Sequence, residues 1–314
     1  MKREKFNWFR IALQLRGSVI PSIWKRVVFC GSFGLLVSIA YALNLSVSNQ
    51  VLGTVIPSIV LGLLLVFRTN TAYERFWEGR KCWGSIVTNI RNLARQIWVS
   101  ISEIEPSDRE KKIQALRLLV AFAVATKLHL RGEPVNAELE ELLSPEQYYR
   151  LKSMKHPPLE VAFWIGDYLQ LQAHRETLNP CHLSTPLGLL NNMVESLGGC
   201  ERILKTPMPL AYAIHLKQLL LLYCFLLPFQ LVQSLGWWTG PVIGLVSFTL
   251  FGIEAIGIEI ENPFGYDAND LPLDAICAAM RRNIEDLISL SPSVGAYEQR
   301  ESGVERNSKS SPLH

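Results

Sequence analysis

The chain has 314 residues, of which 49% are hydrophobic and only 19% are charged, and its formal net charge is +3. Soluble globular proteins carry roughly 25% charged residues, so the shortage of charge and the clustering of the apolar residues indicate an integral membrane protein with a substantial polar part. The small net charge argues against nucleic acid as a partner. The six cysteines form no CxxC pair, which predicts neither a disulfide framework nor a zinc site.

Four apolar stretches have the length and composition of membrane spans, which need about 17–25 predominantly apolar residues. They occupy residues 27–43, 51–67, 210–235 and 237–258. The N-terminus is basic and amphipathic, and no convincing cleavage site follows the first apolar stretch, so a signal peptide is not predicted.

Loop charge predicts the orientation of these spans. The loops at residues 44–50 and 236–241 contain no Lys or Arg, whereas Arg68, Arg75 and Arg80 follow the second span closely. Lys and Arg are enriched in cytoplasmic flanks. We therefore expect a multi-pass protein of the cell membrane with both termini in the cytoplasm, and an internal photosynthetic membrane is the alternative location.

The second span carries Ile59, Leu63 and Phe67 at positions i, i+4 and i+8, so the three side chains share one helical face. Periodicity alone favours ordinary packing against lipid or another helix. The alternative is a ring of apolar side chains around a symmetry axis, which forms a hydrophobic constriction that gates by wetting and dewetting.

The span passes without a break into a charged, aromatic-rich helix whose seam includes Phe76, Trp83, Ile90 and Ile97. The aromatic residues lie among arginines, a combination that also occurs where proteins stack nucleic-acid bases. Because they share the apolar seam, we favour packing into a helical core. Further helical patterns, without any alternating strand pattern, occupy residues 113–130, 159–171, 187–204 and 273–287.

The fold class predicted is an all-α membrane protein, with four transmembrane helices continuous with a helical cytoplasmic bundle. The predicted segments are an N-terminal amphipathic segment with two membrane helices (1–67), a cytoplasmic helical region (68–209), two further membrane helices (210–258), a post-membrane turn with a cytoplasmic helix (259–290) and a disordered tail (291–314).

Acidic residues near the end of the fourth span have two interpretations. Glu254 lies inside the apolar stretch, where an acid is costly, and we expect it to pair with a basic residue such as Lys217 or Arg68. Farther on, Asp267 and Asp270 follow a Gly turn. Closely spaced oxygen ligands can hold calcium, but a capping turn for the next helix is favoured.

A catalytic interpretation has no starting point in this sequence. There is no HExxH pair, no nucleophile motif and no glycine loop that would cradle phosphate. We therefore predict that the chain is not an enzyme, and we assign no residue as a metal ligand. The histidines are scattered at His129, His156, His174, His182, His215 and His314.

Two blocks resemble the bestrophin family, in particular its bacterial and chloroplast-type branch: LLLVFRTNTAYERFWEGRKCWGSIVTNIRNLARQ at residues 63–96 and IENPFGYDANDLPLD at residues 260–274. The resemblance implies a homopentameric ion channel in the lipid bilayer with one axial pore. It places Ile59, Leu63 and Phe67 at a narrow neck of that pore, in preference to simple packing.

The resemblance also implies what the channel conducts. Chloride and other small anions are expected, with a monovalent-cation channel on the same scaffold as the alternative, and a membrane-anchored scaffold protein as the alternative of another class. Calcium-activated relatives carry a run of acids after NPFG, which is interrupted here. Asn262, Asp267 and Asp270 are therefore read as a remnant of the calcium clasp or as a helix-capping turn, and no cofactor is predicted.

Overall fold

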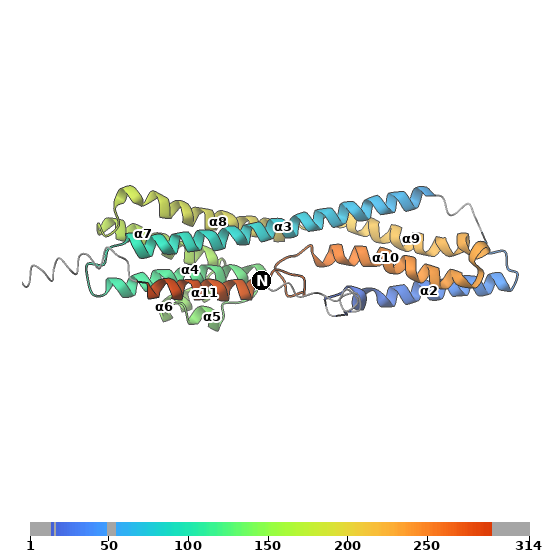
Figure 1. Ribbon diagram of the computed structural model, residues 1–314, viewed down its shortest axis with the longest axis horizontal. Coiled ribbons are helices and arrows are strands. Elements are labelled where there is room, and N and C mark those ends of the chain that lie inside the picture. Colours follow the sequence, from blue (N-terminus) through green and yellow to red (C-terminus); the bar gives the residue numbers. More distant parts are fainter. Residues whose placement is uncertain (1–13, 16, 49–54, 291–314) are drawn as a thin grey trace, which may run out of the picture. The chain divides into compact units, whose positions relative to one another are not determined.

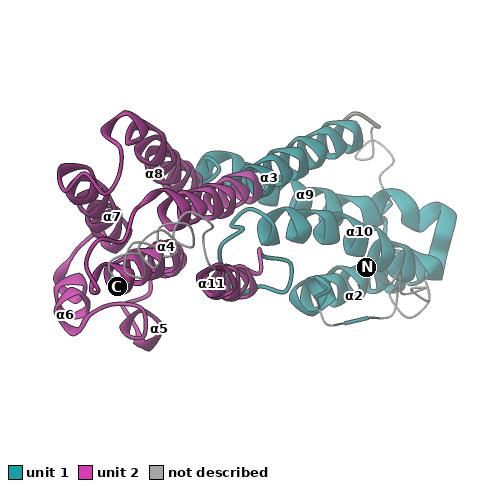
Figure 2. Cartoon of the chain, turned by 60° about the vertical axis from the view of Figure 1, so that its left-hand side comes forward, with its two compact units in different colours: residues 1–78, 205–270 teal, residues 79–204, 271–314 magenta. Residues whose placement is uncertain are grey.

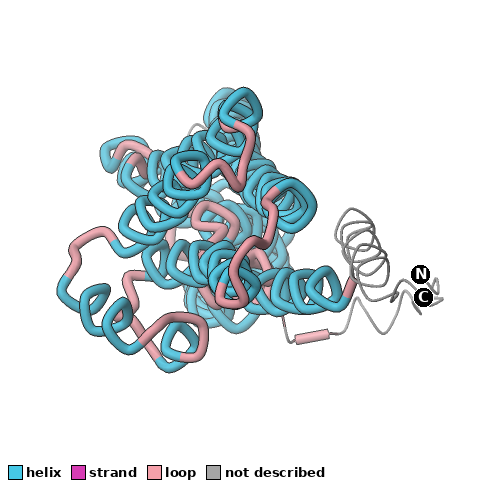
Figure 3. Tube along the Cα trace, turned by 90° about the vertical axis from the view of Figure 1, so that its left-hand side faces the viewer, coloured by secondary structure: helices cyan, strands magenta, loops and turns pink. Residues whose placement is uncertain are grey.

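The computed structural model describes residues 14–15, 17–48 and 55–290, and every regular element among them is helical (Figure 1). Figure 3 shows these helices joined by loops and turns. The prediction of an all-α fold is confirmed. The elements are α2 (Ile20–Ala42), α3 (Val55–Ser100), α4 (Asp108–Arg131), α5 (Ala137–Glu140), α6 (Pro145–Ser153), α7 (Pro157–His174), η2 (Pro180–His182), α8 (Ser184–Lys205), α9 (Leu210–Leu235), η3 (Gly236–Trp238), α10 (Thr239–Glu259) and α11 (Leu273–Ser289).

The chain forms two compact units, coloured teal and magenta in Figure 2. Unit 1 comprises residues 1–78 and 205–270, and unit 2 comprises residues 79–204 and 271–314. The 46-residue helix α3 runs without interruption from one unit into the other. These boundaries differ from the predicted divisions after residues 67, 209 and 258, because hydropathy marks where apolar sequence ends and not where packing changes. The predicted tail, 291–314, lies outside the described residues.

Three helical stretches among the described residues are long and apolar enough to cross a membrane: Ile20–Ala42, Asp108–Arg131 and Leu210–Glu259, the last of which joins α9 to α10. Asp108–Arg131 is mostly buried within the protein, so it is the core helix of unit 2. The predicted second span begins at residues 51–54, which are not described, and its remainder is the start of α3.

The helices do not begin where the predicted spans begin, because a helix can extend beyond the part that lies in the membrane. Helix α2 begins at Ile20, well before residue 27, because Pro21 suits a first helical turn and the basic residues Lys25 and Arg26 continue the helix. Helix α10 begins at Thr239, because Trp237 and its neighbour lie in the 3₁₀ turn η3.

Helices α2, α9 and α10 pack together in unit 1. The backbones of α2 and α10 approach closely where glycines face each other, and a Cβ atom on Gly34 would lie 3.1 Å from the Cα of Gly240. Small residues permit such approach between apolar helices that lack a hydrophobic driving force in lipid. Near the same contact, the Ser38 hydroxyl donates to the Gly236 carbonyl at 3.0 Å.

Helix α4 forms the centre of unit 2, where α7 and α11 pack against it. The part of α3 in this unit contributes Trp83, Ile90 and Ile97, which are fully buried, as the predicted seam requires. Phe76 is only half-buried. The sequence pattern missed α5 and α6, which are too short to show periodicity. Ser144 and Gln147 form a capping box that starts α6.

Asp108 organises the loop that precedes α4. Its carboxylate accepts the backbone N–H groups of Ile104 at 3.1 Å and Glu105 at 2.9 Å, and Arg175 from the end of α7 donates to both of its oxygens, at 2.8 and 3.2 Å. The Arg175 guanidinium first, and then the backbone donor of Glu105, hold the pKa of the Asp108 carboxyl well below its usual range. The buried carboxylate therefore stabilises the fold in its ionised form.

We expect this carboxylate to make stability depend on pH. A group whose folded pKa is depressed adds stability above its unfolded pKa, about 3.9 for Asp, and that stability is lost as the pH falls further. The free energy of unfolding should therefore decline below about pH 4, less steeply in D108N than in the wild type. Denaturant unfolding of the purified protein across this range measures the slope. The exposed Asp286 supplies the matched control D286N, and equal slopes for D108N and the wild type would contradict the assignment.

Candidate functional site

The predicted neck residues lie on one uncovered face of α3 in unit 1. The side chains of Ile59, Leu63 and Phe67 are 56%, 53% and 62% exposed. Val60 and Val66 are exposed beside them, so the apolar face is wider than the predicted row. Large contiguous apolar surfaces mark contacts with lipid, with protein partners or with a ligand path. Within the described part of a single chain, no element covers this face.

The opposite side of α3 is packed against the rest of unit 1. Leu61, Leu65 and Arg68 are 3%, 2% and 4% exposed. At 3.6 residues per turn, these three positions lie on roughly the other side of the helix from the exposed row. The Tyr212 hydroxyl from α9 donates to the Leu64 carbonyl at 2.7 Å. Packing therefore fixes which face of α3 remains uncovered.

An ion pair anchors α3 where the apolar row ends. The Arg68 guanidinium donates to Glu261 at 3.2 Å, and α10 can approach this side chain because Gly257 has no Cβ, which would lie 3.4 Å from Arg68 Nε. Glu261 also accepts the backbone N–H of Met208 at 3.0 Å.

Arg75, farther along α3, makes a second connection to Glu261. It donates to the Glu261 carbonyl at 3.2 Å and to the Thr206 carbonyl. Arg68 and Arg75, which follow the apolar stretch closely in the sequence, thus tie α3 to the segments that flank α9 and α10. Their positive charges are engaged in holding the helix rather than displayed on its uncovered face.

Glu254 is buried, as predicted, but its partner is different. Its carboxylate lies 3.4 Å from the Arg26 guanidinium of α2 and is only 2% exposed. The expected partners, Lys217 and Arg68, were wrong. Arg26 precedes the predicted first span, and the earlier start of α2 is what brings it level with Glu254 on α10.

The post-membrane turn is held by its own polar groups. Asp270 accepts the backbone N–H of Asp267 at 2.8 Å, and Asn262 accepts that of Phe264 at 3.3 Å. Helix α11 begins after Pro272, and no side-chain cap is formed at that residue. The interpretations of Asn262, Asp267 and Asp270 as a helix-capping turn or as a calcium-clasp remnant both stay predictions.

Asn269 lies between Asp267 and Asp270 in the sequence and connects this turn to two other segments. Its amide donates to Glu259 at 2.8 Å and to the Gly17 carbonyl at 3.3 Å. A Cβ on Gly265 would lie 2.7 Å from an Asp270 oxygen, so the turn accepts no larger residue there without rearrangement.

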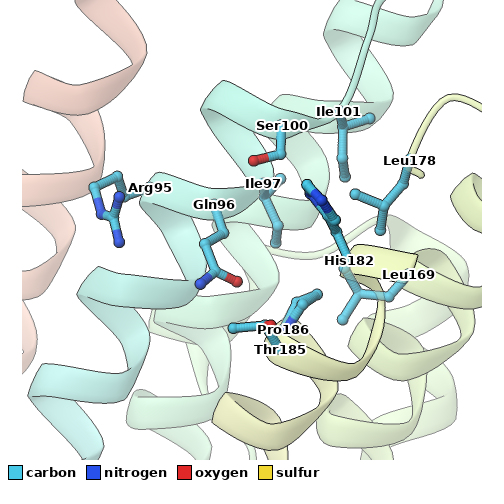
Figure 4. Close-up of a pocket in the computed structure, with 10 residues that line it drawn as sticks. All are labelled: Arg95, Gln96, Ile97, Ser100, Ile101, Leu169, Leu178, His182, Thr185 and Pro186. Carbon is cyan, nitrogen blue, oxygen red and sulfur yellow. The ribbon is translucent and has the colours of Figure 1, made fainter. Parts of the chain in front are cut away.

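Unit 2 contains a cavity of about 340 Å³ that no sequence motif predicted. Figure 4 shows Gln96 and His182 on facing sides of this space, with Leu169 and Pro186 below them. The Gln96 carbonyl oxygen is buried and accepts no hydrogen bond from the described residues. The cavity is near the small end of the range for ligand sites, and its lining mixes polar with apolar groups.

These features define an all-helical membrane protein with a helical second unit and one long helix shared by both. Residues 1–286 match the family described as Bacterial/Fungal Bestrophin protein, and the chain belongs to the bestrophin family. Members of this family are ion channels, so the chain is a channel-family protein and not an enzyme. The resemblance that the two sequence blocks indicated is confirmed.

Relatives and a solved structure cover nearly the whole chain. A voltage-dependent anion channel-forming protein of Nostoc sp. is 71% identical over 298 residues, which is 95% of this chain and 97% of the relative. A protein of the same description from Synechocystis sp. is 57% identical over 285 residues, 91% and 93% of the two chains. The crystal structure of a bacterial bestrophin homologue from Klebsiella pneumoniae superposes with a TM-score of 0.77 at 29% identity, covering 86% of this chain and 100% of that one.

Proposed function

We propose that the protein is a passive channel for chloride and other small anions, built from five copies around one axis. The uncovered apolar row Ile59, Leu63 and Phe67 carries this proposal, because it lies opposite the packed side of α3 and needs a covering partner or an axis to face. The names of the similar proteins from Nostoc and Synechocystis, both described as anion channel-forming, support anions as the permeant ions.

In this proposal the neck works without fixed charge. Residues 57–67 contain no ionisable side chain. A ring of apolar side chains conducts when it is wet and closes when it dries. At Phe67 the positive edge of each aromatic ring helps an anion that has lost part of its water. Neither step requires a cofactor, so currents in EGTA should equal those in calcium.

The membrane topology belongs to the same proposal. Four helical spans cross the bilayer of the cell membrane, with an internal photosynthetic membrane as the alternative, and both termini lie in the cytoplasm. The exposed tryptophans Trp237 and Trp238, between α9 and α10, support an outer interface at that turn. The exposed apolar face of α3 then points toward the axis shared by the copies.

Ion substitution tests the proposal. The purified protein is incorporated into planar bilayers with a higher NaCl concentration on one side, and the reversal potential is measured. We expect it to move toward the chloride equilibrium potential. Movement toward the sodium value would replace the proposal with a monovalent-cation channel. Protein that reconstitutes in the bilayer without any conductance would favour a membrane-anchored scaffold, and native mass spectrometry of the detergent complex tests for five copies.

A further inference from the structure

Two histidines and one glutamate converge in unit 2, whereas the uncovered face of α3 belongs to unit 1. The Nε2 atoms of His129 and His156 each lie 2.7 Å from the same Glu201 oxygen. The two imidazole rings are 4.5 Å apart between centroids. All three potential ligand atoms lie within 4.8 Å of one another. No catalytic or channel role described above uses these residues.

Each residue is positioned by a different helix. His129 lies in the last turn of α4, which Gly132 ends in a left-handed conformation. His156 is the N-cap of α7, where its Nδ1 accepts the backbone N–H of Leu159 at 3.3 Å. Glu201 lies in α8. The cluster thus connects three helices through residues that are 27 and 45 positions apart in the sequence.

We propose that His129, His156 and Glu201 form a binding site for a divalent transition-metal ion, zinc foremost. Two imidazole nitrogens and one carboxylate oxygen are the ligand set of zinc sites that keep a fourth position for water. Imidazole nitrogen also suits zinc better than calcium or magnesium, which take oxygen ligands. The site goes beyond the proposed conduction and does not depend on it.

The observed distances are compatible with an ion after a small adjustment. Ligand atoms about 2.1 Å from a tetrahedral zinc ion lie about 3.4 Å from one another. The two nitrogen–oxygen distances of 2.7 Å would therefore open by about 0.7 Å. The side chains of His129, His156 and Glu201 are 21%, 35% and 17% exposed, so they have room to move and an ion has access.

Local electrostatics both favour and oppose a cation here. The C-terminal end of α4 carries partial negative charge, which attracts a cation near His129. A cavity of about 520 Å³ beside His129 is also lined by Lys152 and Lys155, whose charges oppose it. Lys152 is held over the ring of Tyr148 at 4.2 Å. The carboxylates of Glu133, which lines the same cavity, and of Glu201 act in the opposite sense and favour a cation.

Metal binding also exchanges one hydrogen bond for a coordination bond. A neutral imidazole has a single nitrogen that can accept. When zinc takes Nε2 of His156, the proton moves to Nδ1 and the contact with the Leu159 N–H is given up. Because this contact is long, at 3.3 Å, its loss is small beside the bonds that the ion forms with three ligands.

The test titrates zinc into purified full-length protein from which metal has been stripped with EDTA. Competition with a chromophoric chelator gives stoichiometry and affinity, and we expect about one zinc per chain. Because loss of an outer hydrogen-bond partner already weakens metal sites by about 10- to 100-fold, removal of a ligand in E201Q or H129Q/H156Q should weaken binding at least about tenfold. E201Q keeps a hydrogen-bond acceptor for both histidines, so its fold is expected to persist.

Two matched controls separate this site from other zinc ligands. H174Q removes an exposed histidine, and C181S/H182Q removes an exposed adjacent pair; neither should change the binding curve. Cobalt bound at the site should lack the intense near-ultraviolet band of a cobalt thiolate. The proposal is overturned if no stoichiometric binding occurs, if E201Q binds zinc like the wild type, or if the cobalt spectrum shows cysteine ligation.

Discussion

Replacing Ile59, Leu63 and Phe67 together with alanine is expected to increase the macroscopic anion current by about tenfold or more. A tenfold rate corresponds to a barrier lower by about 1.4 kcal/mol. The three substitutions remove most of the apolar volume from the uncovered row of α3. In the proposed pentamer these substitutions would widen the neck that a water column crosses, and a wider apolar constriction stays wet more of the time.

The same substitutions should cost little stability. The row is more than half exposed in the single chain, whereas large destabilisation comes from cavities in packed cores. The packed face with Leu61, Leu65 and Arg68 is untouched. The expected result is thus a gain of macroscopic current per reconstituted protein that folds and assembles normally, measured by bilayer recording together with size-exclusion chromatography.

The chain offers a control of identical composition. Leu245, Phe248 and Ile256 are exposed on one face of α10 and comprise the same three residue types. L245A/F248A/I256A removes the same atoms from a face that the proposal assigns no role in conduction, so its currents should match those of the wild type. If the α3 triple variant also matches the wild type, or if both triple variants gain current equally, the neck assignment is wrong.

Replacing Glu261 with alanine is expected to destabilise the protein by about 3–5 kcal/mol, as for other broken buried ion pairs. The reason is that Arg68 is almost fully buried, so its charge would remain inside the protein without the carboxylate that lies 3.2 Å away. The backbone N–H of Met208 would lose its acceptor as well. The free energy of unfolding in detergent, followed by denaturant titration, measures the loss.

A second variant and a control make this prediction specific. Glu259 lies two residues earlier and accepts one exposed amide from Asn269, so E259A should cost much less than E261A. The double variant R68M/E261M removes both charges and keeps apolar volume, and it should recover much of the lost stability because neither charge is left buried alone. If E261A and E259A are equally stable, Glu261 does not anchor α3.

Much of the fold could be predicted from hydropathy and periodicity. Helices α9 and α10 could be predicted from their length and apolar content. The helical spacing of Trp83, Ile90 and Ile97 predicted that these three side chains are buried, as they are in unit 2. The short helices were not predicted, because they are marked only by a local capping signal such as Ser144 with Gln147 and are too short to show a helical repeat of apolar residues. The start of α2 at Ile20 could not be read from the predicted span at 27–43, because a helix can continue through charged residues that hydropathy excludes from a span.

The contacts between distant residues could not be predicted. Glu254 was expected to have a basic partner, yet nothing in the sequence distinguishes Arg26 from Lys217 or Arg68 for that role. Glu261 as the acceptor for Arg68, Arg75 and Met208 had no signal beyond its place before Asn262. The sequence also could not predict that His129, His156 and Glu201 lie together, because no short metal-binding motif contains residues so far apart.

The sequence by itself determined that the chain is helical, that it is a membrane protein, and that it belongs with the bestrophins, because apolar length, helical period and two local blocks are all properties of contiguous residues. It also placed Ile59, Leu63 and Phe67 on one helical face. The tertiary structure decided which face of α3 is packed and which is uncovered, which acid holds which arginine, and that two histidines meet a glutamate. Those outcomes depend on how helices distant in sequence are rotated and packed, and rotation is fixed by the sum of many contacts that no single segment encodes.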